Sequence, residues 1–435
     1  MLVLLIVSLA LVSLHARAYT KVSPIDEQMH IDYMYRAPSV QPVVSGTRLG
    51  PEAMREEACR GIDSAFTPPP CGSPTLRAEQ FQESGYNTAY INPATYYDLT
   101  ALLAHPLQVA LGLSSLVTAG RLVGALWLWL GLVITMLVAR RLGASLQATV
   151  GLLLMAASTP NVLFFSATVS PDSMNLLVGA AVLSLVLAWE TKPARWWLLV
   201  LAAAVGVLVK TQGAIVVLMM GLYLGARAFS HLKQKGIKGP TIAETSLDPQ
   251  VRPRELFVGL LALGTVAVTL GVGWLSAVGR NATLRPELLP MNLMLTHQSS
   301  GNFVQDITGF FPPLGNPPLP AAWDHSEQPW LQILSLVLVG GTLFWVLFRP
   351  SRGPLTSLAS AVTLACLTGP ALFYVMAFVQ HWPHFPIPTR YGMTLLPAMV
   401  VVTAVAVRHR YVAALLIAAG VLSCLTVGVR LGQVA

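Results

Sequence analysis

The chain carries few charges for its length. Only 11% of its 435 residues are Asp, Glu, Lys or Arg, whereas 54% are hydrophobic, and the mean hydropathy is +0.63. Soluble domains contain about 25% charged residues, so the composition excludes an ordinary soluble protein. It predicts an all-α polytopic membrane protein.

The chain also lacks the common nucleotide and nucleic-acid motifs. It contains no Walker loop, no GxGxxG sequence and no His-Glu-x-x-His motif of zinc proteases. A net charge of +8 would suggest a nucleic-acid partner in a soluble protein. Here the basic residues lie in short loops between apolar runs, where they set the orientation in a bilayer. We therefore predict no nucleic-acid binding.

Cysteine is scarce as well. Cys366 and Cys424 fall inside apolar runs, which is typical of unreactive core residues. Cys59 and Cys71 share a large polar segment. If that segment lies outside the cytosol, we expect a disulfide between them, with two free thiols as the alternative.

The first apolar stretch, residues 1–18, has two interpretations. Its end, Ala-Arg-Ala at 16–18, fits a signal-peptide cleavage site, but no Lys or Arg precedes the apolar run. We favour an uncleaved first transmembrane helix. The polar segment at 19–98 holds ten of the nineteen acidic residues, and we expect it to be an extracytoplasmic loop that is partly helical.

The rest of the chain alternates apolar runs and short loops. We expect a transmembrane helical core at 99–278, a second extracytoplasmic loop at 279–328 and further transmembrane helices at 329–435. Because the run at 196–229 far exceeds the roughly 20 residues that a span needs, we interpret it as two short helices that turn at Lys210. Including residues 1–18, the predicted spans number about eleven, and the others are 116–138, 146–165, 174–189, the two in 196–229, 256–278, 330–348, 355–378, 391–407 and 411–429.

The distribution of charge predicts the orientation. Lys and Arg are concentrated in the loops at 190–195, 231–254, 349–352 and 408–410, whereas most carboxylates lie in the two large loops. The positive-inside rule places the N-terminus inside and both large loops outside. We expect a multi-pass protein of the bacterial cytoplasmic (inner) membrane.

Ionisable residues beside membrane spans are functional candidates, because charge is costly in lipid. Asp26 and Glu27 lie just past the first apolar stretch, and His30 follows about one helical turn later. A partly desolvated Asp26 would suit general acid/base catalysis; a solvated acid pair without a role is the alternative. Asp26 and His30 could also bind a divalent metal, although no third ligand stands at motif spacing.

Three cations lie in or beside predicted spans, namely Arg121, Lys210 and Arg390. Each is either a snorkelling anchor or part of a phosphate site, where Arg would bind as a fork and Lys as a point charge. Asp172 closes a Ser-Pro-Asp sequence that is typical of a helix start, and a role in the site is its alternative.

The sequence Pro-x-Asp-Glu-x-x-His at 24–30 resembles the start of the GT-C glycosyltransferase superfamily. The chain as a whole resembles more closely an uncharacterised bacterial family of predicted membrane proteins that is related to those enzymes. No single motif is specific, and the likeness depends on the order and spacing of several stretches. These are 24–30, 92–97, 120–123, 167–172, 209–211 and 389–397.

The resemblance implies a GT-C-like fold and a polyprenyl-phosphate-linked sugar as donor substrate. The sugar would pass at the outer face to a glycan, lipid or protein acceptor, with Asp26 as general base and Glu27 as a helper or metal contact. We predict Asp26, Glu27 and His30 as catalytic. The predicted substrate-binding residues are Arg390, Tyr391, Lys210, Arg121, Asp172, Tyr96 and Tyr97.

Two other functions fit the composition. A transporter or flippase of a lipid-linked glycan would place paired charges and broken helices at mid-membrane, whereas these acids lie at a predicted membrane edge. A non-catalytic membrane assembly protein would tolerate alanine at both Asp26 and Glu27.

The orientation can be tested with fused reporters. A reporter fused after Lys235 should be active only as a cytoplasmic fusion, because the basic residues around it hold that loop inside. A reporter fused after Cys59 should be active only as an extracytoplasmic fusion, because its long loop is predicted to lie outside. Fluorescent-protein and alkaline-phosphatase activities of the two fusions measure this, and the reverse pattern would overturn the scheme.

Overall fold

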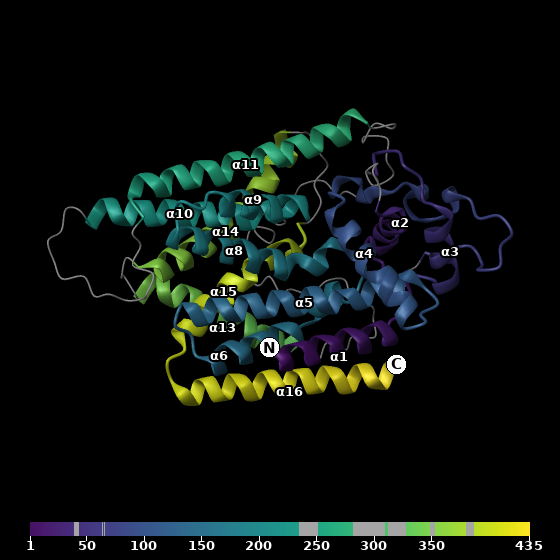
Figure 1. The fold of residues 1–435 in the computed structure, drawn as a ribbon. Helices are drawn as coiled ribbons and strands as arrows, with labels where there is room; N and C mark the ends of the chain where they lie inside the picture. Colours follow the sequence, from purple (N-terminus) through teal and green to yellow (C-terminus); the bar gives the residue numbers. More distant parts are fainter. Residues whose placement is uncertain are drawn as a thin grey trace.

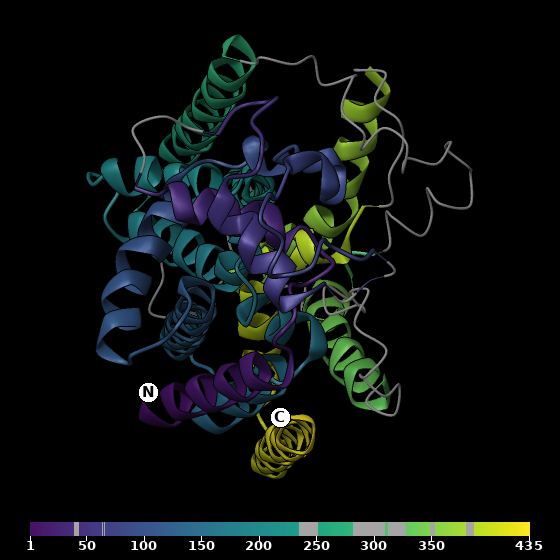
Figure 2. The same ribbon diagram turned by 90° about the vertical axis from the view of Figure 1, so that its right-hand side faces the viewer.

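The computed structural model describes residues 1–38, 43–62, 64, 66–234, 251–281, 309–311, 328–348, 353–379 and 387–435. The regular elements of this part are helices, accompanied by two isolated β-bridges. Long helices run side by side along one axis, and the region that carries α2 and α3 covers one end of the bundle (Figure 1). We call this end the α2–α3 end; Figure 2 shows it facing the viewer.

The helices have the following bounds. In chain order they are α1 (Leu2–Ala18), α2 (Glu27–Arg36), α3 (Pro51–Arg60), α4 (Thr95–Ala110), α5 (Leu116–Arg141), α6 (Leu146–Ala157), α7 (Pro160–Ser166), α8 (Asn175–Thr191), α9 (Trp197–Leu208), α10 (Ala214–Gln234), α11 (Pro253–Arg280), α13 (Gln328–Phe348), α14 (Pro354–Val379), α15 (Leu396–Ala406) and α16 (Arg410–Val434). Short 3-10 turns precede several of them, and three matter below. These are η4 (Pro171–Met174), η5 (Thr211–Gly213) and η9 (Thr389–Leu395).

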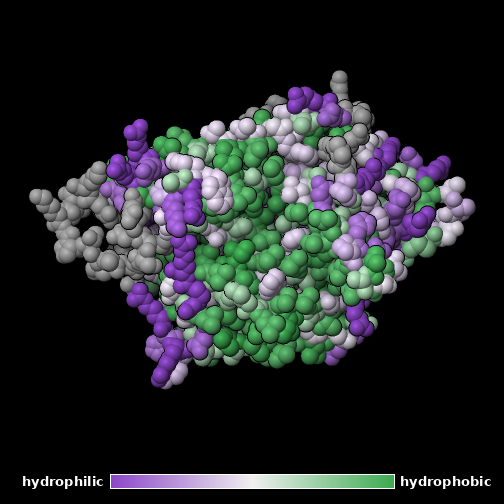
Figure 3. All heavy atoms as spheres, viewed as in Figure 1, coloured by the Kyte–Doolittle hydropathy of each residue, from purple (hydrophilic) through white to green (hydrophobic). Residues whose placement is uncertain are grey.

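The structure has fewer membrane spans than the sequence predicts. In the described part, seven helices are long and apolar enough to cross a bilayer, or eight if the bent pair α6–α7 counts as one span. The protein is therefore an all-α polytopic membrane protein, but the prediction of about eleven spans is wrong. A broad apolar band between two polar ends is visible on the surface (Figure 3).

Three predicted spans fall short in length. These are α1, α9 and the described apolar part of α13, Ile333–Phe348. The indole of Trp129, halfway along α5, donates a 3.3 Å hydrogen bond to the Met1 carbonyl, so α1 runs beside only half of α5. Helix α9 has 12 residues and ends just before Lys210, which confirms the predicted break in that run.

The predicted span at 146–165 is bent by 69° between α6 and α7. Pro160 begins α7 and has no N–H to donate to the preceding turn. The Ser158 hydroxyl instead bonds back to the carbonyls of Leu154 and Met155 at 3.0 Å. The bend turns the chain so that the segment after α7 reaches the start of η4.

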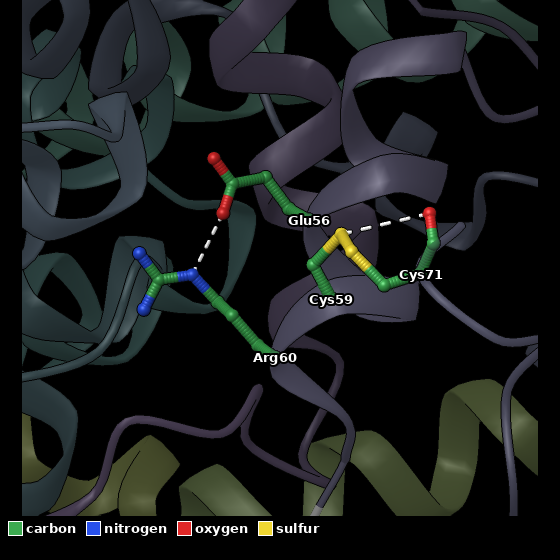
Figure 4. The surroundings of a disulfide bond; sticks show 4 residues. All are labelled: Glu56, Cys59, Arg60 and Cys71. Carbon is green, nitrogen blue, oxygen red and sulfur yellow. Dashed lines mark hydrogen bonds and ion pairs between the residues drawn. A yellow bond between two sulfur atoms is a disulfide. The ribbon is translucent and has the colours of Figure 1, made fainter.

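The segment after α1 forms the α2–α3 end. A disulfide joins Cys59 of α3 to Cys71, beside the Glu56–Arg60 ion pair (Figure 4). Arg60 also donates to the Thr118 hydroxyl, at 3.0 Å, so α3 is attached to the first turn of α5. Most of the predicted second loop at 279–328, and Lys235, lie outside the described residues.

Helices α8 and α10 are tied together far from the α2–α3 end. The Glu190 carboxylate, near the end of α8, accepts a hydrogen bond from Arg227 of α10 at 2.8 Å and another from the Tyr223 hydroxyl. All three side chains are buried. Isolated charges do not remain in such surroundings, so the pair fixes these helices relative to each other.

Close backbone contacts bring α8 against η9. A Cβ atom at Gly179 of α8 would overlap the carbonyl of Thr394, whereas one at Gly264 of α11 would meet nothing within 4 Å. Glycine at position 179 therefore allows the start of α8 and the η9 turn to lie side by side.

This contact generates a stability prediction. Gly179→Ala should destabilise the protein by about 1–3 kcal/mol, because packed backbones must separate. Gly264→Ala is the matched control, and should be neutral or stabilising by up to about 1 kcal/mol. Thermal unfolding in detergent measures both, and equal melting temperatures for the two variants would contradict the packing described.

Candidate functional site

Four charged side chains from distant parts of the chain meet at the α2–α3 end. The Arg390 Nη2 atom lies 3.5 Å from Asp26 Oδ2, and its Nε atom lies 3.2 Å from Asp172 Oδ2. Lys210 Nζ forms an ion pair with the other Asp172 oxygen. The contacts form a chain of alternating charge, Asp26–Arg390–Asp172–Lys210.

Each member of this chain stands where a helical segment begins. Asp26 is the N-cap of α2, and Asp172 lies in η4, which leads into α8. Lys210 precedes η5 and α10, and Arg390 lies in η9 before α15. Helix starts carry partial positive charge, so cations are disfavoured there and anions are favoured. The two carboxylates offset this accumulation of positive charge.

The exposed fraction of the side chain falls steeply from Asp26 through Arg390 to Asp172. The side chains of Asp26, Arg390 and Asp172 are 58%, 14% and 3% exposed, respectively. Asp26 is therefore the member that faces solvent, and Arg390 lies directly beneath it.

Asp172 has further neutral partners. Asn175 donates a 2.8 Å hydrogen bond from Nδ2 to Asp172 Oδ1 and lies 3.2 Å from the Arg390 carbonyl. Ser170 caps the turn by accepting from the Asp172 N–H at 3.3 Å, which confirms the predicted helix start. Asn175 is not among the residues predicted from the sequence, although its position three residues after the first-turn acid is a signal for this contact.

Asp26 has an uncommon backbone conformation. Its φ is +58°, and Glu83 and Ser84 are the other non-glycine residues with positive φ in the described part of the chain. Such residues are strained and tend to occur at functional sites. Burial, and secondarily the charge of Asp26, raise the pKa of Glu83, so the two carboxylates sense each other. The sequence offers no signal for this proximity.

Glu27 and Arg121 form a buried pair beside Asp26. Arg121 donates from Nε and Nη2 to the two oxygens of Glu27, at 2.9 and 2.7 Å. Glu27 also accepts from the backbone N–H groups of Ser23 and Val169, at 2.7 and 2.9 Å. Each carboxylate oxygen thus has two donors, which differs from the expected helper or metal contact.

Arg121 is equally committed. It donates to the carbonyls of Tyr19 and Lys21, both at 2.7 Å, in addition to Glu27. The pair therefore fixes the chain before Asp26 and, through Val169, the chain before Asp172. Both residues act here as positioning residues, and Arg121 has little donor capacity left for a substrate.

His30 lies behind the charged chain. Its Nδ1 atom is 2.8 Å from the Tyr97 hydroxyl. Burial, followed by the charges of Lys210 and Arg390, lowers the pKa of His30 to about 3, against an opposing effect of Asp172. His30 is therefore neutral at physiological pH and contributes a hydrogen-bonding group rather than a charge.

The two tyrosines that are predicted to bind substrate are buried. Tyr97 stacks on Tyr33 with ring centroids 4.0 Å apart, and the Tyr96 hydroxyl accepts from the Ser170 N–H at 3.0 Å. Tyr96 and Tyr97 are 1% and 0% exposed. They support the helix starts from within the protein instead of lining an open surface.

Aromatic rings surround the two cations. Lys210 Nζ lies 4.9 Å from the centroid of the Tyr391 ring, and the Arg390 guanidinium lies 5.4 Å from that of Phe165. Phe310, from the described part of the second predicted loop, is buried against Gly392.

In the described residues, no group of three or more His, Cys, Asp or Glu side chains could hold a metal ion.

The buried pair generates a prediction. Arg121→Met should destabilise the protein by about 3–5 kcal/mol, because it leaves the Glu27 charge buried and unpaired. Glu79→Gln, which removes the exposed partner of Arg48 at the protein surface, should cost about 1 kcal/mol or less. Unfolding in detergent with increasing denaturant measures the difference.

Exchanging the two charges gives a stricter test. Glu27→Arg combined with Arg121→Glu keeps the ion pair, but it turns a carboxylate toward carbonyls and a guanidinium toward N–H groups. We expect no recovery, and recovery to wild-type stability would show that charge alone matters.

A family model described as DUF2142, predicted membrane protein, matches residues 68–301, more than half of the chain. The match includes Tyr97, Asp172 and Lys210 but not Asp26 or Arg390. None of the curated proteins compared with the chain matches it. The chain belongs to the DUF2142 family of predicted multi-pass membrane proteins.

Proposed function

We propose that this protein is a membrane glycosyltransferase of the GT-C type. It would transfer a sugar from a polyprenyl-phosphate donor to an acceptor at the outer face of the cytoplasmic membrane. The observation that carries this proposal is the position of Arg390, which contacts the exposed Asp26 on one side and the buried Asp172 on the other.

The surroundings of Arg390 suit a phosphate group. Lys210 stands at the start of the η5 turn and Arg390 at the start of the η9 turn, so two positive charges lie close together here. Asp172 orients Lys210 and Arg390 but neutralises only one of their two charges. An anion that takes the place of Asp26 at the outward side of Arg390 would therefore be stabilised electrostatically, as the leaving phosphate of a glycosyl transfer requires.

Asp26 supplies the base in this proposal. Its carboxylate takes the proton of an acceptor hydroxyl while the acceptor oxygen forms a bond to the anomeric carbon. The bond between that carbon and the phosphate oxygen breaks, and the polyprenyl phosphate leaves with the electron pair. Arg390 and Lys210 stabilise the charge that develops on it. Attack opposite the leaving group inverts the anomeric configuration.

The location of the charges favours an enzyme over a transporter or flippase. The four members of the charged chain lie at helix starts at one end of the bundle. A transport site would be expected near mid-membrane between broken helices.

Asp26→Asn tests the proposed reaction. Purified protein in nanodiscs is mixed with a panel of polyprenyl-phosphate sugars and an envelope extract as acceptor source, and released polyprenyl phosphate is quantified by mass spectrometry. The variant should lower the release rate about 100-fold or more, because loss of a general base costs about 10²–10⁴-fold.

Glu52→Gln serves as the matched control, because Glu52 is an exposed acid on α3 whose loss changes the net charge equally. It should leave the rate unchanged. Full activity of Asp26→Asn would exclude the mechanism, provided that both variants reach wild-type amounts in the membrane.

A further inference from the structure

The outward side of Arg390 is already occupied by a carboxylate. We infer that Asp26 and a phosphate group compete for this side of the guanidinium, so that a bound phosphate releases Asp26. The inference rests on the proposed function for the lipid nature of the phosphate, but the competition itself follows from the charged contacts.

The two contacts of Arg390 differ in strength. Asp172 is buried, lies 3.2 Å from Nε, and is held further by Lys210 and Asn175. Asp26 is mostly exposed and lies 3.5 Å from Nη2. Both distances exceed the roughly 2.7–2.9 Å of a strong charge-assisted bond, so the burial and the additional partners of Asp172 make its contact the harder one to break. An arriving anion therefore displaces Asp26 and leaves Asp172 in place.

The charges of the cluster support this exchange. Lys210 and Arg390 carry two positive charges, which Asp172 and Asp26 together offset. While Asp26 stays in contact, the cluster has no net positive charge, and a phosphate would add a further anion beside Arg390. Once Asp26 moves away, one positive charge is left for the phosphate.

Asp26 is free to make this movement. It precedes α2 at a positive φ and is more than half exposed. Glu27, the next residue, is held by four donors, so the backbone stays in place while the Asp26 side chain rotates. The carboxylate is then close to the reacting group but no longer paired with a cation.

Competition makes the base available only after the donor has bound. A carboxylate oxygen that no longer contacts the Arg390 guanidinium is free to accept the hydrogen bond of an acceptor hydroxyl. The donor phosphate would thus free Asp26 to act as the base by binding Arg390 in its place. The expected order of binding is donor first and acceptor second.

Binding of a phosphate lipid tests this without any turnover. Radiolabelled polyprenyl phosphate is titrated onto wild type, Asp26→Asn and Glu52→Gln in phosphatidylcholine nanodiscs by a proximity assay. Asn tolerates positive φ well, so Asp26→Asn should fold. It should bind about fivefold more tightly than wild type, because the phosphate no longer has to break the exposed Asp26–Arg390 ion pair. Such a pair contributes about 1 kcal/mol, which corresponds to this factor. Glu52→Gln should bind like wild type.

Two further ligands identify what is recognised. Unphosphorylated polyprenol should show no gain in Asp26→Asn, and inorganic phosphate is titrated as a competitor in both proteins. A gain for the lipid phosphate supports a membrane ligand, whereas a gain confined to inorganic phosphate supports the competition but assigns a soluble anion.

The outcomes separate the two proposals. If wild type binds the lipid phosphate and Asp26→Asn binds it equally or more weakly, the competition is wrong while the proposed function stands. If neither protein binds lipid phosphate or inorganic phosphate, both proposals fail.

Discussion

The structure depends on a buried lysine and a largely buried arginine that both stand at the starts of helical turns. Charge is expensive in an apolar interior, and the positive ends of helix dipoles add to that expense for a cation. Asp172 resolves the problem by lying between Lys210 and Arg390. The positions of η4, η5 and η9 follow from this one carboxylate, because each must bring its residue within reach of it.

A second buried pair orders the surroundings. Glu27 and Arg121 satisfy N–H and carbonyl groups on two chain segments, residues 19–23 and Val169, in addition to each other. Removing either partner would leave a charge without compensation, whereas a surface pair contributes little. The exposed Asp26 thus directly precedes a residue, Glu27, whose side chain is held by four donors.

Part of this arrangement could be predicted from the sequence. The composition indicates a membrane protein, and the cost of charge in lipid singles out Asp26, Lys210 and Arg390. Local patterns cannot show that these residues meet, because they lie far apart in the chain. The same limit hides Asn175 and Glu83, and it leaves Glu27 and Arg121 with expected roles that differ from their contacts. The span count was too high because hydropathy alone does not show where apolar runs bend or stop short.

The pair formed by Glu190 and Arg227 has a mechanical consequence. Helices α8 and α10 carry Asp172 and Lys210 near one end and this second ionic link farther along. Fastened at two separated points, the helices resist sliding or hinging against each other. In any conformational change, Asp172 and Lys210 would then keep their relative positions. The segments that move relative to this pair would be α2 or the η9–α15 segment.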